Sequence, residues 1–208
     1  MITRREVVPA FLEKDPKLLR RRFSQVKSKR YHVDVMDGTF TPYRTAPASS
    51  LRGLKKRITV HFMVDRPSAK LGQLQGVAEE VIAPIESVGK VAVFVHAAHA
   101  RGMRVGLSIN PDTPFRRILP HLGKLDSVMV MTVNPGRQGQ PFVRRALGKV
   151  RALRRRFPTL PIAVDGGVNS RTMRAIIGSG ADILVIGSAI VNAADPQAEL
   201  RKLQKDVA

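Results

Sequence analysis

The sequence predicts an α/β protein in which eight parallel strands close into a (β/α)8 barrel, also called a TIM barrel. Three observations predict this fold. Eight short apolar segments alternate with longer basic segments of amphipathic character, as expected of buried strands and their covering helices. The length of 208 residues is close to the lower limit for a complete barrel. Glycine-bearing turns follow the sixth, seventh and eighth strands and not the first, which favours a closed barrel over an open doubly wound sheet.

The strands are expected where short apolar runs occur along the chain. In order, these runs are residues 6–9, 31–36, 58–63, 80–84, 103–109, 127–131, 162–164 and 183–186. Helical spacing of apolar side chains is clearest in residues 17–29, 88–101, 141–157 and 170–179. Because no linker interrupts the alternation, we expect residues 1–208 to form a single catalytic domain.

The composition excludes several kinds of chemistry. The chain has no cysteine, so disulfides and thiolate chemistry are excluded and His, Asp and Glu are the metal donors available. No apolar run is long enough to span a membrane, and the N-terminus has no apolar export signal, so we expect a cytoplasmic protein without a membrane partner. Neither a G-x-G-x-x-G fingerprint nor a Walker loop is present, which argues against nucleotide binding.

The formal net charge of +20 has two interpretations. A basic surface can bind nucleic acid or anionic headgroups, or it can simply be solvated. The basic residues are spread over most of the predicted helices, and two tyrosines without any tryptophan offer little for base stacking. We therefore expect only non-specific nucleic-acid binding. Such a charge opposes assembly, while barrels often associate through helix faces. Both a monomer and a homo-oligomer are therefore compatible with the sequence.

Four side chains at strand ends form the main candidate site. His32 and Asp34 are two residues apart on one predicted strand, so both point into the barrel. His61 lies near the end of the next strand, and Asp165 ends the seventh. Two imidazoles and two carboxylates suit Zn, Fe(II), Mn or Co. Each residue alone has a structural explanation, but their joint occurrence at three strand ends indicates a metal site.

Glycines in three successive turns form a second candidate site. Glycine lets a backbone N–H approach an anion closely, and Asn169 or Ser170 can cap the helix that follows the seventh strand. We therefore expect these turns to bind phosphate. The residues concerned are Gly136, Gly139, Gly166, Gly167, Gly187 and Ser188.

Three methionines, Met36, Met63 and Met131, each lie near the end of a different predicted strand. From the residues alone, filling of an irregular core is the preferred interpretation. The alternative is a polarizable wall that keeps water from a reacting carbon.

Six segments carry a family resemblance between about Pro9 and Ser188: HVDVMDGTF, VHFMV, GLSINPDTP, VMTVNPGRQGQPF, VDGGVN and GADILVIGSAI. Together they resemble the signature segments of the ribulose-phosphate 3-epimerase family. The resemblance implies a barrel of the ribulose-phosphate-binding type. It also implies a metal-dependent epimerase of the pentose phosphate pathway, which interconverts D-ribulose 5-phosphate and D-xylulose 5-phosphate by two-base proton transfer through an enediolate.

The same resemblance implies a role for each candidate residue. Asp34 and Asp165 would be the catalytic acid and base, and with His32 and His61 they would bind one divalent ion. The methionines would line the reacting centre, and the glycines with Ser188 would hold the phosphate of the sugar. This chemistry needs no organic cofactor.

Four positions depart from the family pattern. Ala10 replaces a serine near the end of the first strand, and Pro84 replaces a histidine at the end of the fourth. Arg137 and Gln138 replace an apolar residue and a glycine in the sixth turn. These changes bear on the substrate and on loop closure more than on the type of reaction.

Two alternative functions follow from these observations. An epimerase for a ketohexose 6-phosphate, such as allulose 6-phosphate, would explain the altered strand ends. A catalytically weak barrel that binds nucleic acid through its basic surface would explain the charge.

Overall fold

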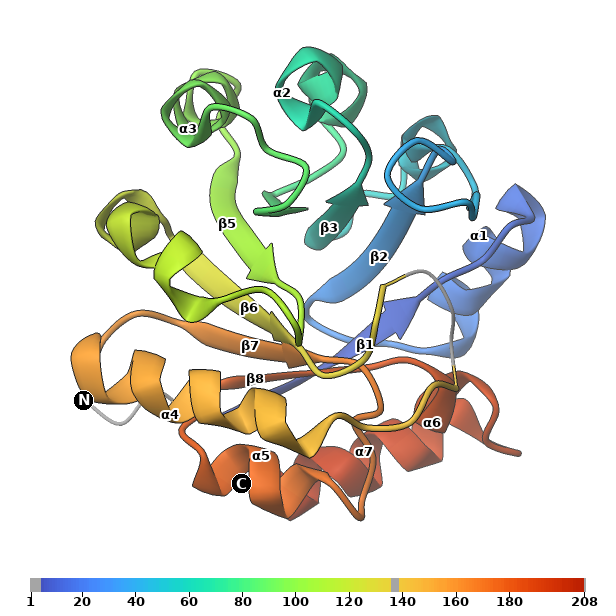
Figure 1. Ribbon diagram of the computed structural model, residues 1–208. Helices are drawn as coiled ribbons and strands as arrows, with labels where there is room; N and C mark the ends of the chain where they lie inside the picture. Colours follow the sequence, from blue (N-terminus) through green and yellow to red (C-terminus); the bar gives the residue numbers. More distant parts are fainter. Residues whose placement is uncertain (1–4, 136–138, 208) are drawn as a thin grey trace.

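A computed structural model describes residues 5–135 and 139–207 of the chain. Its eight strands form a closed parallel barrel in which each strand pairs with the next and β8 pairs with β1 (Figure 1). The strands are β1 (Glu6–Phe11), β2 (Tyr31–Met36), β3 (Ile58–Met63), β4 (Glu80–Pro84), β5 (Arg104–Ile109), β6 (Ser127–Met131), β7 (Ile162–Asp165) and β8 (Ile183–Ile186). The predicted (β/α)8 fold is therefore confirmed.

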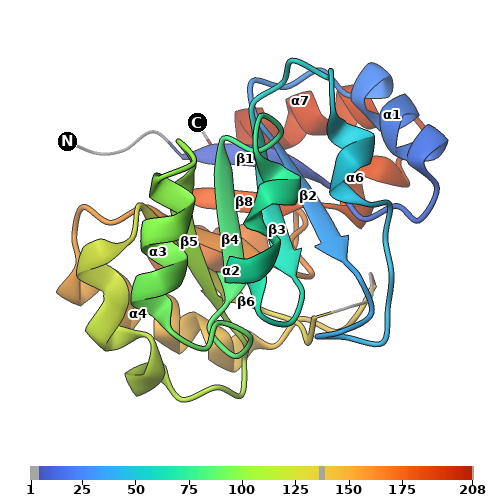
Figure 2. The same cartoon turned by 90° about the horizontal axis from the view of Figure 1, so that it is seen from above.

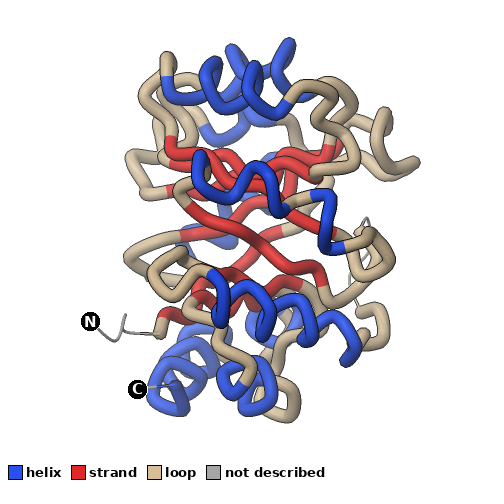
Figure 3. Tube along the Cα trace, turned by 60° about the vertical axis from the view of Figure 1, so that its left-hand side comes forward, coloured by secondary structure: helices blue, strands red, loops and turns tan. Residues whose placement is uncertain are grey.

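Helices surround the barrel on the outside (Figure 3). The α-helices are α1 (Pro16–Gln25), α2 (Pro67–Lys70), α3 (Val91–His99), α4 (Leu147–Arg156), α5 (Met173–Gly178), α6 (Ser188–Val191) and α7 (Pro196–Val207). Short 3-10 helices complete the connections: η1 (Ala48–Leu51), η2 (Leu71–Leu74), η3 (Phe115–Arg117), η4 (Leu119–Lys124) and η5 (Arg144–Ala146). Helices α2 and α3 lie side by side on one flank (Figure 2). Over the described part of the chain, no helix has both the length and the apolar character needed to cross a membrane.

Several elements differ from the predicted bounds by a few residues. Strand β1 continues two residues further because Ala10 and Phe11 pair with β2. Helix α1 ends at Gln25 because Val26 turns into the core and is fully buried. The helix predicted at residues 141–157 begins as the 3-10 turn η5, and α4 follows it.

The alternation of side chains along the strands divides the buried residues into two groups. On β2, Tyr31, Val33 and Val35 face outward and join the large core between strands and helices. His32 and Asp34 occupy the intervening positions and face the barrel interior, as period-2 geometry requires. The interior also holds a small apolar cluster that includes Met129 and Met131.

A buried carboxylate lies at the start of β4. Glu80 is 4% exposed and accepts hydrogen bonds from Thr59 Oγ1 at 3.0 Å and from Ser127 Oγ at 2.7 Å. Buried charged groups are stable only when hydrogen-bonded or paired. The two hydroxyls give one bond to each Glu80 oxygen.

Candidate metal centre and adjoining pocket

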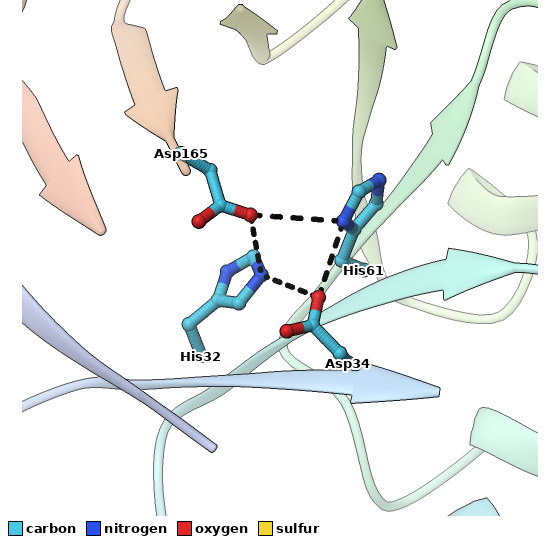
Figure 4. A group of neighbouring side chains, drawn as sticks. All are labelled: His32, Asp34, His61 and Asp165. Atoms are coloured by element: carbon cyan, nitrogen blue, oxygen red, sulfur yellow. Dashed lines mark hydrogen bonds and ion pairs between the residues drawn. The ribbon is translucent and has the colours of Figure 1, made fainter. Parts of the chain in front are cut away.

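The four predicted ligands come together inside the barrel (Figure 4). Asp34 and His61 are directly paired neighbours on β2 and β3, so the register of these strands sets their contact. Asp165 is the last residue of β7 and approaches from the other side of the two imidazole rings. One ligand atom from each of the four residues lies within 4.8 Å of the other three.

The spacing of these atoms leaves room for one shared ion. Nδ1 of His61 is 3.2 Å from Oδ1 of Asp34 and 3.9 Å from Oδ2 of Asp165. Nε2 of His32 is 3.5 Å and 4.0 Å from the same two oxygens. This nitrogen is buried and has no hydrogen-bond partner among the described residues. A buried polar atom without a partner is costly, and a cation at the centre of the cluster would satisfy it. The donor set therefore fits a divalent metal.

The two carboxyl groups have opposite pKa shifts. Burial alone would raise the pKa of Asp34, but its interactions with the nearby His32 and His61 rings outweigh burial and hold that pKa well below its usual range. For Asp165, burial and the negative charge of Asp34 raise the pKa to about 6. Burial would lower the pKa of His32, yet its interaction with Asp34 and the charges of the nearby carboxylates raise that pKa above the usual value for histidine. Without an ion, the cluster therefore holds protons that an ion would have to displace.

We expect metal affinity to increase with pH for this reason. Below a pH of about 6, Asp165 is protonated in the folded protein, and His32 keeps its extra proton to a higher pH than an ordinary histidine does. Each displaced proton should tighten binding about tenfold per pH unit, until the pH exceeds the pKa of that group. Titration of the metal-free protein with Co²⁺ in a calorimeter, from about pH 5 to about pH 8 and in buffers of different ionisation enthalpy, measures both affinity and proton release. An affinity that does not change over this range would contradict the expected proton displacement.

A pocket opens beside the four residues. Asp34 and Asp165 both line it, as do Met63 and Met131. Met36 does not line it: this side chain is buried, and its sulfur accepts a hydrogen bond from Thr41 Oγ1 at 3.3 Å. The structure thus brings two of the three predicted methionines to the pocket.

Most of the predicted phosphate residues also line the pocket. They are Gly139, Gly166, Gly167, Gly187 and Ser188. Gly136 lies outside the described residues, together with Arg137 and Gln138.

The turn after β7 requires glycine for steric reasons. Gly166 has a φ of +104°, and a Cβ there would lie 2.4 Å from Cγ2 of Val133. Gly167 has a φ of +63°, and its Cβ would lie 3.2 Å from Cβ of Phe142. Residues other than glycine rarely adopt such backbone angles, and here neighbouring atoms also occupy the space that a Cβ atom would need. The turn is further braced by Asn169, whose Oδ1 accepts the backbone N–H groups of Arg171 at 2.9 Å and Thr172 at 3.3 Å.

The pocket and the metal centre contain residues that the motifs did not indicate. Leu12, Val133 and Gln140 line the pocket. Ser108 lies behind the metal centre, where its Oγ is 3.0 Å from Nε2 of His61. The sequence held one sign that Ser108 belongs to the site: it is a polar residue on the inward face of β5, a strand that is otherwise mostly apolar. Of the departures, Ala10 lines the pocket, while Pro84 pairs with Ser108 at the end of β4.

Comparisons with known proteins match most of this chain to proteins of one family. A model described as the "Ribulose-phosphate 3 epimerase family" matches residues 6–191. The ribulose-phosphate 3-epimerase of Schizosaccharomyces pombe is 36% identical over 184 residues, which cover 85% of this chain and 81% of that protein. The cytoplasmic isoform from Oryza sativa subsp. japonica is 36% identical over 185 residues, with the same coverage of 85% and 81%. The crystal structure of 3-hexulose-6-phosphate synthase from Salmonella typhimurium has a TM-score of 0.73 at 19% identity, covers 97% of this chain and 98% of that one, and supports the fold alone.

Proposed function

This chain belongs to the ribulose-phosphate 3-epimerase family, and we propose that it interconverts D-ribulose 5-phosphate and D-xylulose 5-phosphate by inverting C3. The relatives from Schizosaccharomyces pombe and rice are both named for this activity, which supports a pentose phosphate as substrate. The hydrogen on C3 is adjacent to the carbonyl of a 2-ketose, so it can be removed as a proton to give an enediolate.

The observation that carries the proposal is the meeting of two carboxylates, from β2 and β7, at one cluster beside the pocket. Inversion requires that one group remove the proton from one face of the sugar and that another return a proton to the opposite face. Asp34 and Asp165 reach the cluster from different strands, and both also line the pocket. We assign them as the two acid/base residues.

The opposite pKa shifts of the two carboxyl groups support this pairing. In the metal-free protein, Asp34 is held ionised, while the pKa of Asp165 is raised to about 6. Acid/base pairs in enzymes commonly consist of two carboxyl groups whose surroundings drive their pKa values apart in this way. The roles of acid and base exchange when the reaction runs in the reverse direction.

We propose that His32, Asp34, His61 and Asp165 hold one divalent ion, which is Zn, Fe(II), Mn or Co by the preference of this donor set. When bound, the ion supplies Lewis-acid stabilisation for the negative charge that develops on the substrate oxygens. The residues of the chain orient the sugar and move the proton. No organic cofactor is required.

The rest of the pocket would position the substrate. We propose that backbone N–H groups at Gly139, Gly166, Gly167, Gly187 and Ser188 bind the phosphate, because these residues line the same pocket as the two carboxylates. Met63 and Met131 would exclude water from C3. Anchoring at the phosphate holds C3 at a fixed place between the two carboxyl groups.

Solvent exchange tests the proposed reaction directly. The metal-loaded protein is incubated with D-ribulose 5-phosphate in deuterated water, and NMR follows deuterium at C3 together with D-xylulose 5-phosphate. We expect both to appear, and we expect the Asp34→Asn variant to form no epimer. Absence of deuterium uptake with each of the four metals would contradict the proposal.

A ketohexose 6-phosphate is a second candidate substrate, because Ala10 gives the pocket wall a small side chain without a hydroxyl. Measurement of kcat/KM for ribulose 5-phosphate and allulose 6-phosphate side by side separates the two. A higher value for the hexose phosphate would transfer the assignment to that substrate.

Restoring a hydroxyl at this position should improve binding of the pentose phosphate. We expect Ala10→Ser to lower KM for ribulose 5-phosphate about fivefold, since one added hydrogen bond contributes about 1 kcal/mol. Steady-state kinetics measure the effect, and Ala10→Val controls for the added volume. An unchanged KM in the serine variant would show that this wall does not contact the sugar.

Two further assignments stay proposals. We propose a cytoplasmic location, the compartment named for the rice relative. We also propose that the charge of +20 supports only non-specific binding of nucleic acid.

A further inference from the structure

The two histidines of the metal centre have different surroundings. His61 is fully buried, with Nδ1 3.2 Å from Oδ1 of Asp34 and Nε2 3.0 Å from Oγ of Ser108. Both ring nitrogens of His61 therefore have a partner at hydrogen-bonding distance. Nε2 of His32, in contrast, faces the carboxylates without a hydrogen-bond partner among the described residues.

The backbone holds Ser108 firmly behind His61. Ser108 pairs with Pro84 on β4 and with Met129 on β6, so it lies in the middle of three paired strands. Its carbonyl accepts the N–H of Ile85 at 2.9 Å, and its side chain has no solvent exposure. The hydroxyl can rotate, but its oxygen cannot move far from the ring.

The proton on His61 must be on the correct nitrogen for the ring to bind a cation. Nδ1 faces the carboxylate cluster, so it must offer a lone pair, and the proton must then be on Nε2. A buried N–H requires an acceptor, and the oxygen of Ser108 is at the right distance to accept it. Partners of this kind behind a metal-binding histidine orient the ring and determine which nitrogen is free.

A hydroxyl also suits the metal-free protein. Without an ion, Nδ1–H can donate to Asp34, and Nε2 can accept a hydrogen bond from the same Ser108 hydroxyl. The ring can therefore change tautomer while both nitrogens keep a partner. An alanine at this position would leave Nε2 without a partner in both states.

We infer that Ser108 is a positioning residue: its hydroxyl accepts the Nε2–H of His61 and so presents Nδ1 to the divalent ion. The inference rests on the proposed function, which requires that ion. Ser108 touches neither substrate nor metal in this role, and it acts entirely through His61.

The test compares Ser108→Ala with the native protein and with Ser179→Ala. Ser179 is a matched control because it is also a buried serine, and its hydroxyl donates to the carbonyl of Ile176 in α5. Circular dichroism and thermal melting first establish folding. Calorimetric titration with Co²⁺ and Zn²⁺ then measures metal affinity, and ¹⁵N NMR of the zinc-loaded proteins identifies the histidine tautomers.

We expect Ser108→Ala to bind both metals about 10- to 100-fold more weakly, and Ser179→Ala to bind them like the native protein. In the native zinc complex, His61 should be the Nε2–H tautomer. Ser108→Thr keeps the hydroxyl and should restore most of the affinity.

Three results would overturn the inference, and they differ in what they say of the proposed function. Equal affinity in Ser108→Ala and native protein would remove the role of Ser108 and leave the metal-dependent epimerase standing. Absence of metal binding in the native protein would remove both. If Ser108→Ala does not fold, the His61 tautomer in the native zinc complex tests the inference instead. An Nδ1–H tautomer of His61 in that complex would exclude the proposed arrangement.

Discussion

Replacing Asp165 with asparagine is expected to lower kcat for epimerisation by about a thousandfold or more, within the range that positioned acid/base groups contribute. The amide keeps the shape of the carboxyl group at the end of β7 but cannot accept or return a proton. Asp34 remains, so the variant should still exchange the C3 proton of one of the two epimers with solvent. NMR in deuterated water, started from each epimer separately, measures both activities.

The control for this variant is Asp126→Asn. Asp126 directly precedes β6, so it lies at the opposite end of the barrel from the metal centre, where it pairs with His99 at 2.9 Å. We expect nearly native kinetics from the control. Epimer formation by Asp165→Asn at a rate close to native, with metal content unchanged, would overturn the two-base assignment.

Removal of the metal is expected to have an effect of similar size. Lewis-acid stabilisation contributes several kcal/mol, so dialysis against a chelator should reduce kcat/KM roughly a thousandfold. Readdition of Zn, Fe(II), Mn or Co one at a time should restore activity and rank the metals. Full activity in a protein shown by elemental analysis to be free of metal would contradict the assignment of His32, Asp34, His61 and Asp165.

Thermal melting provides a readout of metal binding that is independent of turnover. An ion that binds only the folded protein stabilises it by about 2.7 kcal/mol at a hundredfold excess over its Kd. The melting temperature should therefore rise on readdition of metal, and it should rise less in Asp34→Asn. An identical rise in both proteins would place the ion somewhere other than at this cluster.

The convergence of the four candidate ligands could be predicted because it follows from strand geometry. Residues two apart share a face, which brings His32 and Asp34 inward together, and the ends of parallel strands meet at one rim. The structure adds the register of β2 and β3, which pairs Asp34 directly with His61. The closed barrel follows from the alternation and from the placement of the glycine turns.

Contacts across the barrel could not be predicted in the same way. Ser108 on β5 meets His61 on β3, which is the next strand but one, and the stagger of the closed barrel determines which inward residues share a layer. The same stagger joins Glu80 on β4 to Ser127 on β6. Met36 has an inward position by alternation, yet local packing against Thr41 decides where its sulfur lies. Single-strand periodicity carries no information on any of these distances.

The turn that holds Gly166 and Gly167 also limits how this enzyme can change during evolution. Any side chain at Gly166 would collide with Val133, and Gly167 has a backbone angle that other residues rarely adopt. Ala10, on the pocket wall formed by β1, is free of such backbone constraints because its strand is regular and extended. We therefore expect adaptation to a new sugar to proceed through substitutions in the β1 wall, because a side chain in the β7 turn would displace its neighbours.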